Sequence, residues 1–194
     1  MTQNHKLVLA SSSPRRQEML KGLGLTFTID PADVDETPHK GEAPRDYVRR
    51  VAIDKVRTVA ARQGGALVLG ADTTVAVGRR ILGKAESAEE AADMLRLMAG
   101  RRHRVFTTVV LALSDGTIRE KTTNTVVKIR PLTEAMIAAY VAQPAAWRGV
   151  AGAYGLQTAI GGALVAEING SASGVIGMPL VETVNLLRSA GLDV

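Results

Sequence analysis

The chain of 194 residues is long enough for one hydrophobic core, with 46% hydrophobic and 22% charged residues, which is typical of a globular protein. No apolar run approaches the roughly 20 residues of a membrane span and no signal-peptide pattern is evident, so we expect a cytoplasmic protein without membrane attachment. Cysteine is absent, which excludes disulfides and thiolate metal sites. The net charge of +5 is dispersed among acidic residues and aromatic residues make up only 3%, which argues against stable nucleic acid binding. The modest positive surplus suits a small polyanionic substrate as well as it suits a nucleic acid. From the length we expect a single domain over residues 1–194.

The first apolar run, residues 6–10, predicts a strand buried on both faces. Ser13 is suited to the N-cap of a following helix and Pro14 to its first position, which places Arg15 and Arg16 in the first turn. Cations at this positive end of the helix dipole are unfavourable by up to about 1 kcal/mol each unless an anion lies among them. The pattern indicates a phosphate site, and the alternative is that both arginines point into solvent.

An acidic segment follows a strand predicted over residues 26–29. Residues 30–39 carry four carboxylates and two prolines, which predicts an irregular segment with most of its acids in solvent. One or two carboxylates of this kind are what a hard divalent cation requires. A long helix is then predicted from Pro44 to about Gln63, with an apolar stripe and with Lys55 near its middle.

The next apolar run, residues 66–71, predicts a buried strand that delivers Asp72 at its carboxyl end. Ligands of α/β proteins bind at such ends, so Asp72 is a candidate site residue; the alternative is an aspartate that caps a turn. Residues 75–82 predict a hairpin that leads to Lys84. Residues 78–84 match the start of a P-loop, but Ala85 lacks the required hydroxyl and no helix is predicted at Lys84, so we reject a P-loop and keep Lys84 as a phosphate-binding candidate.

Most of the remaining chain has clear helix and strand signals. The capping-box helix begins at Ser87 and ends at Gly100, β-rich runs cover 105–113 and 118–129, a helix runs from Thr133 to Ala142, a strand covers 164–168 and a last helix runs from Pro179 to about Gly191. The glycine-rich residues 147–162 are expected to contribute little to the core and to become ordered only by closing on something, with Gln157 able to recognise a base edge. The order of elements predicts an α/β protein with a mixed, elongated sheet flanked by helices.

Five motifs in register make the chain similar to a known family. They are Leu9-Ala10-Ser11-x-Ser13-Pro14-Arg15-Arg16, Asp35-Glu36 before Arg50-Val51-Ala52-x-x-Lys55, Gly70-Ala71-Asp72-Thr73, Gly83-Lys84, and Ala151-Gly152-Ala153-Tyr154-Gly155-Leu156-Gln157. Together they resemble the Maf family of nucleotide pyrophosphatases over nearly the whole chain. Thr158 and Ser173-Gly174 depart from the residues that this family often has at those places.

The resemblance implies hydrolysis of a nucleoside triphosphate to its monophosphate and pyrophosphate, assisted by Mg²⁺ or Mn²⁺. It also implies a fold related to that of inosine triphosphate pyrophosphatases, with two lobes and the nucleotide in a cleft between them, and it suggests a homodimer. An alternative of another class is a nucleotide-binding regulator of cell division or septum formation with little turnover.

The resemblance further assigns roles to single residues. Asp72, Glu36 and Lys84 are the expected catalytic residues, with Asp72 as proton acceptor and Glu36 and Asp72 as metal contacts. The expected substrate-binding residues are Ser11, Arg15, Arg16, Lys55, Thr73 and Gln157, and Lys84 also belongs to the phosphate-binding set. Arg15, Thr73 and Gln157 resemble the branch that acts on dTTP and UTP. The sequence leaves open whether Asp72 is base, metal ligand or both.

Overall fold

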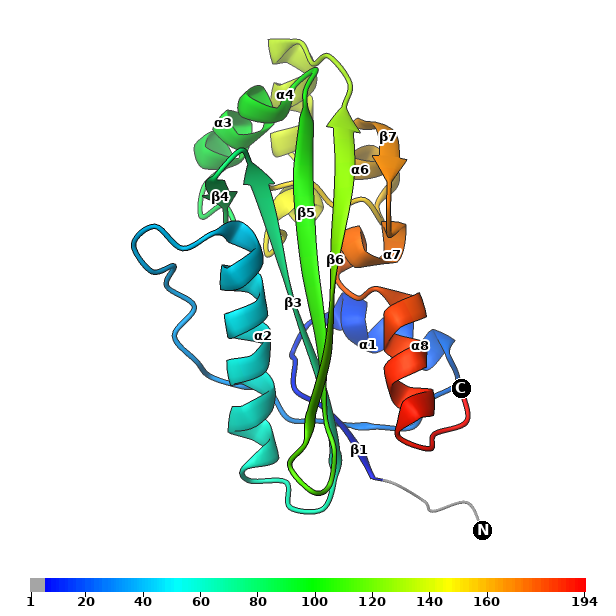
Figure 1. Cartoon of the computed structure of the whole chain (residues 1–194). Helices are drawn as coiled ribbons and strands as arrows, with labels where there is room; N and C mark the ends of the chain where they lie inside the picture. The colour runs from blue at the N-terminus through cyan, green and yellow to red at the C-terminus, as the bar shows by residue number, and fades with distance from the viewer. Residues whose placement is uncertain (1–5) are drawn as a thin grey trace. The chain divides into compact units, whose positions relative to one another are not determined.

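The computed structural model describes residues 6–194 as a mixed sheet flanked by helices (Figure 1). The strands are β1 (Leu7–Leu9), β2 (Thr28–Ile29), β3 (Leu67–Val77), β4 (Arg80–Leu82), β5 (Arg102–Ala112), β6 (Ile118–Ile129) and β7 (Val165–Asn169). The helices are α1 (Pro14–Gly22), α2 (Pro44–Ala60), α3 (Ala88–Met98), α4 (Glu134–Val141), α5 (Pro144–Trp147), α6 (Ala159–Gly162), α7 (Ala172–Ile176) and α8 (Leu180–Ser189). The predicted α/β class is confirmed, although the short helices α5, α6 and α7 were not predicted.

The strand order is β2-β1-β3-β5-β6-β7, with β4 paired to β3. β1 runs parallel to β2 and β3, whereas the β3–β4 and β6–β7 pairs are antiparallel. The chain divides into two compact units, which share β3, β5 and β6. The first unit comprises the chain through Asp72 together with Thr107–Thr122 and Gly177–Val194, and the second comprises Thr73–Phe106 and Thr123–Ile176.

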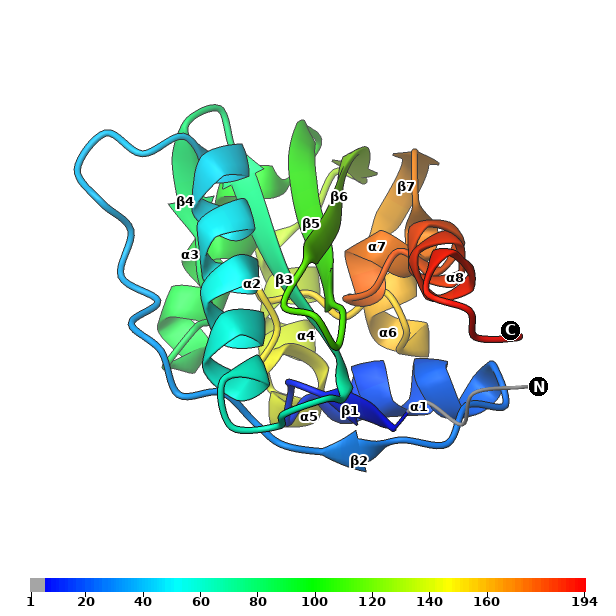
Figure 2. The same ribbon diagram turned by 60° about the horizontal axis from the view of Figure 1, so that its bottom comes forward.

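In the first unit, alternate residues of β1 pack on opposite faces of the sheet. Leu7 and Leu9 join an apolar cluster that includes residues of α1 and α8, whereas Val8 joins a second cluster that includes residues of α2. Figure 2 shows α2 on one side of the strands and α8 on the other. This packing confirms the predicted strand buried on both faces. The predicted apolar stripe of α2 is also buried, at Tyr47, Val48, Val51, Val56 and Val59.

In the second unit, α3 and α4 pack against one another and cover apolar residues of the sheet (Figure 1). Both predicted helix caps are formed, because the side chain of Ser87 accepts from the N–H of Glu90 and that of Thr133 accepts from the N–H of Met136. These caps satisfy backbone donors that have no partner inside the helix. No helix among residues 6–194 is both long and apolar enough to cross a membrane.

The prediction that Asp72 follows the end of a strand is wrong. β3 continues to Val77, so Asp72 lies in the middle of an eleven-residue strand. Thr73 and Thr74 are β-branched and fit a strand as well as a turn, and residues 75–77 pair with β4. The polar residues 72–74 suggest the end of a strand, but the structure places the carboxylate of Asp72 inside the sheet.

The prediction that residues 147–162 contribute little to the core is also wrong. Trp147 and Tyr154 are only 1% and 2% exposed. The indole Nε1 of Trp147 donates to the carbonyl of Val141 at 3.0 Å, and the hydroxyl of Tyr154 lies 2.8 Å from Nε2 of His103. A few large side chains therefore anchor this segment in the second unit, and its glycine content gave no sign of this.

Candidate active site

The centre of the candidate site in the first unit is an ammonium shared by two carboxylates. Nζ of Lys55 lies 2.8 Å from Oδ1 of Asp72 and 2.9 Å from Oε1 of Glu36. The side chains of Lys55 and Asp72 are 11% and 10% exposed, whereas that of Glu36 is 44% exposed. The structure thus brings together three of the predicted site residues from α2, β3 and the acidic segment.

A glycine allows α2 to lie close to β3 at this point. A Cβ atom on Gly70 would lie 2.5 Å from Cγ2 of Val56 and 3.4 Å from Cβ of Ala10. Gly70 precedes Asp72 by two residues on β3, and Val56 directly follows Lys55 on α2. The missing side chain therefore permits the approach that brings Lys55 to Asp72.

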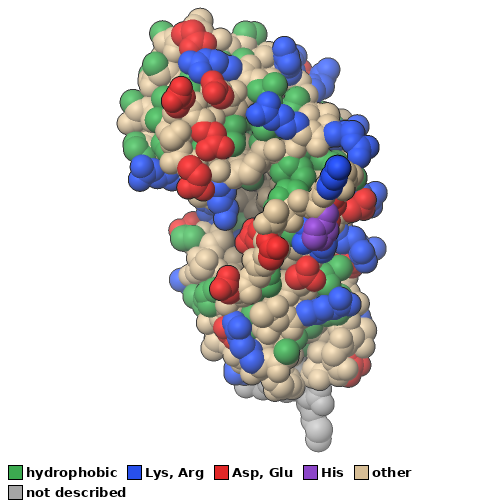
Figure 3. Space-filling view, turned by 90° about the vertical axis from the view of Figure 1, so that its left-hand side faces the viewer, with side chains coloured by type: hydrophobic (Ala, Val, Ile, Leu, Met, Phe, Trp, Pro, Cys, Tyr) green, Lys and Arg blue, Asp and Glu red, His purple; other side chains and the backbone are tan. Residues whose placement is uncertain are grey.

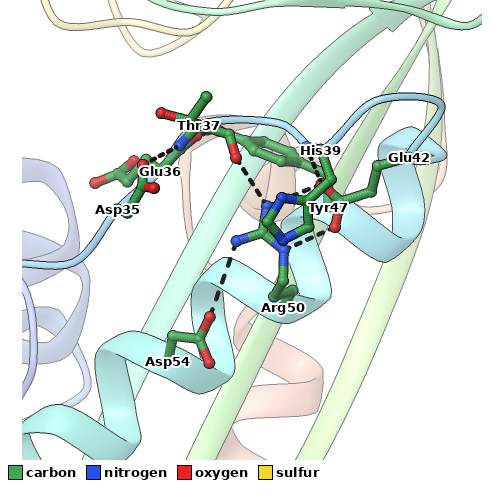
Figure 4. Close-up of polar contacts among 8 residues, drawn as sticks. All are labelled: Asp35, Glu36, Thr37, His39, Glu42, Tyr47, Arg50 and Asp54. Atoms are coloured by element: carbon green, nitrogen blue, oxygen red, sulfur yellow. Dashed lines mark hydrogen bonds and ion pairs between the residues drawn. The ribbon is translucent and has the colours of Figure 1, made fainter.

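The acidic segment that carries Glu36 is attached to α2 (Figure 4). The hydroxyl of Tyr47 donates to the backbone carbonyl of Glu36 at 3.0 Å. Arg50 donates from Nε and Nη2 to the two carboxylate oxygens of Glu42, at 2.7 and 2.8 Å, and from Nη2 to the carbonyl of Thr37 at 3.1 Å. Sequence reasoning gave neither Tyr47 nor Arg50 a role in the site; the signal that was available is their position on the helix of Lys55.

The serine and arginine at the start of α1 form a second part of the site. Arg16 donates from Nη1 to Oγ of Ser11 at 3.1 Å and from Nε to the carbonyl of Gly177 at 2.9 Å. Oγ of Ser11 also accepts from the N–H of Ser13 at 3.2 Å, so both of these bonds leave the Ser11 hydroxyl hydrogen available to an anion. Ser13 occupies the predicted N-cap position, although its side chain makes no capping bond.

Arg16 does not point into solvent, which was the alternative for this pair of arginines. Burial lowers the pKa of Arg16, and the negative charge of Asp72 opposes that shift. Burial also lowers the pKa of Arg15, with the charge of Glu18 acting in the opposite direction. A guanidinium stays charged at neutral pH in any such environment. The negative charge expected near the first turn of α1 is therefore supplied in part by Asp72.

The remaining predicted residues, Thr73, Lys84 and Gln157, belong to the second unit. Lys84 is exposed and forms an isolated antiparallel bridge with Ala151, and the N–H of Gly152 donates to the carbonyl of Gly83 at 2.9 Å. These contacts bring two of the five motifs side by side. No helix begins at Lys84, in agreement with the rejection of a P-loop.

Gln157 is exposed and lies beside Gly155, where an added Cβ would be 3.0 Å from Nε2 of Gln157. The hydroxyl of Thr158 accepts from the N–H of Gly161 and donates to the carbonyl of Gly155. Thr158 thereby caps α6, which gives a structural reason for its departure from the family pattern.

Comparisons with known proteins agree with the five motifs. A family model described as "Maf-like protein" matches residues 6–190. The chain belongs to the Maf family. It is 48% identical over 195 residues to a protein of Novosphingobium aromaticivorans named dTTP/UTP pyrophosphatase, covering 100% of this chain and 96% of that protein. A Caulobacter vibrioides protein of the same name is 47% identical over 186 residues and matches 95% of each chain.

Two solved structures are also similar to this Maf family member over 64% of its length. One is a nucleoside-triphosphatase / dITP/XTP pyrophosphatase of Mycobacterium abscessus, with 16% identity, a TM-score of 0.41 and 72% of that chain covered. The other is the Ham1 protein of Staphylococcus aureus, with 18% identity, a TM-score of 0.45 and 71% of that chain covered.

Glu36 and Asp72 are the residues of this Maf family member that could hold a divalent cation. Residues 6–194 contain no group of three or more His, Asp or Glu side chains placed to hold a metal. Glu36 and Asp72 nevertheless share one ammonium, so their oxygens already face a common cation position. Mg²⁺ is typically held by one or two carboxylates and by substrate phosphates, and these two residues fit that requirement. Figure 3 shows acidic and basic side chains interspersed on the surface over the acidic segment and α2.

Proposed function

We propose that this protein hydrolyses nucleoside triphosphates, preferably dTTP and UTP, to the monophosphate and pyrophosphate. The observation that carries the proposal is the buried Asp72 carboxylate, which is paired with Lys55 and lies close enough to Arg16 to affect its pKa. This arrangement combines a proton acceptor with the cations that a triphosphate requires. The relatives named dTTP/UTP pyrophosphatase, 48% and 47% identical, support the choice of substrate.

In the proposed reaction, a water oxygen attacks the α-phosphorus of the nucleotide. The bond between the α-phosphorus and the oxygen that bridges to the β-phosphorus breaks, and pyrophosphate leaves with the bonding electron pair. Asp72 accepts the proton of the water, and its place inside β3 fixes the carboxylate before substrate binds. Arg16, Lys55 and Ser11 donate to phosphate oxygens as charge moves onto the leaving group.

A divalent cation, Mg²⁺ or Mn²⁺, is part of this proposal, and Glu36 and Asp72 would hold it. When bound, the cation lowers the pKa of a coordinated water and neutralises phosphate charge. Arg15 and Lys84 are proposed to bind phosphate, and Thr73 and Gln157 to contact the nucleotide. We further propose that the protein acts in the cytoplasm and that it forms a homodimer. Sedimentation of the pure protein tests the oligomeric state.

Release of pyrophosphate from a panel of nucleoside triphosphates, with Mg²⁺ and with Mn²⁺, tests the proposal. We expect dTTP and UTP to be the best substrates and Asp72→Asn to reduce kcat by at least about 100-fold, since a positioned proton acceptor typically contributes 10²- to 10⁴-fold. Orthophosphate as the product would indicate a phosphatase instead. Tight nucleotide binding with no turnover would indicate a regulatory nucleotide-binding protein.

A further inference from the structure

Glu36 lies in a segment with no regular structure of its own. Residues 30–43 connect β2 to α2 without helix or strand. Fixing a residue of such a segment costs backbone conformational entropy, so a carboxylate there is placed reproducibly only if other groups hold the backbone. The contacts that hold Glu36 are therefore part of the site.

Two residues of α2 hold Glu36 from opposite ends. Tyr47 donates to its backbone carbonyl at 3.0 Å, and Lys55 pairs with its carboxylate at 2.9 Å. Tyr47 and Lys55 are eight residues apart, close to two helical turns, so both project from similar faces of α2. One rigid helix thus defines the position of both the backbone and the side chain of Glu36.

Arg50 fixes the chain on the other side of Glu36. Its fork binds both carboxylate oxygens of Glu42, and its Nη2 also donates to the carbonyl of Thr37 (Figure 4). The guanidinium carbon lies 5.7 Å from the ring centroid of Tyr47, so the cation also packs on the residue that holds Glu36. We call these contacts of Arg50 with Glu42, Thr37 and Tyr47 the Arg50 clamp.

The clamp is better enclosed than an ordinary surface ion pair. The side chains of Arg50 and Glu42 are 23% and 10% exposed. Within the segment, Oδ1 of Asp35 accepts from the N–H of Thr37 at 2.8 Å, and Oε2 of Glu42 accepts from the N–H of His39 at 3.0 Å. Bidentate arginine–carboxylate pairs are geometrically specific, so the clamp restricts the conformation of residues 35–42 as well as their distance from α2.

We propose that Arg50 is a positioning residue, which fixes the acidic segment on α2 so that the carboxylate of Glu36 faces Lys55 and Asp72. The inference rests on the proposed function for the role of Glu36, whereas the clamp itself depends only on the contacts above. In this proposal Arg50 acts through Glu36 and has no contact of its own with nucleotide or cation.

The test compares Arg50→Met with the matched control Arg49→Met. Arg49 is the neighbouring residue of α2, its side chain is 54% exposed, and it pairs with Glu120 at 2.5 Å rather than with the acidic segment. Hydrogen–deuterium exchange reports on the amides of Thr37 and His39 without any turnover. We expect Arg50→Met to accelerate their exchange about tenfold or more, and Arg49→Met to leave it within about twofold.

Turnover then shows whether Arg50 acts through Glu36. We expect Arg50→Met to lower kcat/KM for UTP about tenfold in the wild-type background and less than about twofold in a Glu36→Gln background, because coupled residues are non-additive. Arg50→Lys, which keeps the charge but loses the fork, should be intermediate. Equal losses in both backgrounds, or unchanged amide exchange in Arg50→Met, would overturn the proposal.

Two further measurements keep the outcomes separable. If Arg50→Met does not fold, Glu42→Gln weakens the same clamp from the other end and should accelerate the same amides. If the wild-type protein releases no pyrophosphate from any nucleotide, the proposed function fails. Titration with Mn²⁺ alone then tests the role of the Arg50 clamp. We expect Arg50→Met to bind Mn²⁺ more weakly than Arg49→Met does, and equal binding would contradict the proposal.

Discussion

The ammonium of Lys55 and the carboxylate of Asp72 form an ion pair at 2.8 Å, and the side chains of both residues are nearly nine-tenths buried. Two charges in such a place stabilise the fold only as a pair, because each alone loses its hydration without compensation. The pair also links α2 to the middle of β3, where the proposed chemistry takes place. Fold stability and activity are therefore expected to respond together to changes at these two residues.

Lys55→Met is expected to lower the free energy of unfolding by about 3 kcal/mol, because it leaves the buried carboxylate of Asp72 without its cation. The double variant Lys55→Met/Asp72→Asn should recover part of this loss, since the side chain at position 72 is then neutral and no longer requires the cation of Lys55. Urea denaturation of the two variants and the wild type measures both values. If Asp72→Asn lowers the stability of the Lys55→Met variant by as much as it lowers that of the wild type, the two residues are not coupled.

Gly70→Ala is expected to destabilise the protein by about 1–3 kcal/mol, because the new Cβ would lie 2.5 Å from Cγ2 of Val56 and would separate α2 from β3. Val56→Ala in the same chain should relieve the overlap, so the double variant should lose less than the sum of the two single effects. Gly64→Ala is the control, since a Cβ there would meet nothing within 4 Å. Thermal denaturation compares the four proteins, and similar losses in Gly70→Ala and Gly64→Ala would show that close approach is not the cause.

Local patterns predicted much of the first unit, because they act within a few residues. The apolar run of β1, the proline at the start of α1 and the stripe of α2 each specify a local structure that the fold retains. The position of Asp72 was mistaken because a polar residue inside a strand resembles a strand end until its long-range partner, Lys55, is known. The Arg50 clamp was missed for a similar reason, since no local pattern pairs an arginine with a carboxylate in an irregular segment.

In the second unit, the amino-acid composition of residues 147–162 did not indicate that part of this segment is buried. Residues 147–162 are glycine-rich, yet Trp147 and Tyr154 insert into the core and their polar atoms reach Val141 and His103. Those partners lie on α4 and β5, so only the folded chain reveals them. The capped helices of the same unit were predictable because a cap is satisfied within three residues.

The buried His103 is expected to make stability depend on pH between about 6.5 and 4. Burial lowers the pKa of His103 to about 4, below the usual value of 6.5 in the unfolded chain. The unfolded state therefore binds more protons in this range, and stability is lost as the pH falls from 6.5 to 4, by up to about 3 kcal/mol. Above pH 6.5 the contribution is complete.

Urea denaturation at several pH values, compared between wild type and His103→Gln, isolates this contribution. The variant should lose less stability between pH 6.5 and 4.5 than the wild type. Asp30 and Glu42 have pKa values near 2, lowered by Arg62 and Arg50 respectively, so the stability that they add is lost mainly below their unfolded values near 4. Parallel curves for both proteins above pH 4.5 would contradict the assignment to His103.

Gln157→Glu is expected to shift the proposed activity from dTTP and UTP toward a methylated guanine nucleotide. An amide both donates and accepts, as a pyrimidine edge requires, whereas an ionised carboxylate only accepts and suits the donors of a guanine edge. Gln157 is exposed and lies against Gly155, so the substitution should leave the free energy of unfolding nearly unchanged. Gln143→Glu, a change at another exposed glutamine of the second unit, controls for the added charge.

The measurement is the ratio of kcat/KM for UTP to that for 7-methyl-GTP. This ratio should fall by at least about tenfold in Gln157→Glu, since one well-placed hydrogen bond is worth about that factor or more. An unchanged ratio, or an equal change in Gln143→Glu, would remove Gln157 from base recognition.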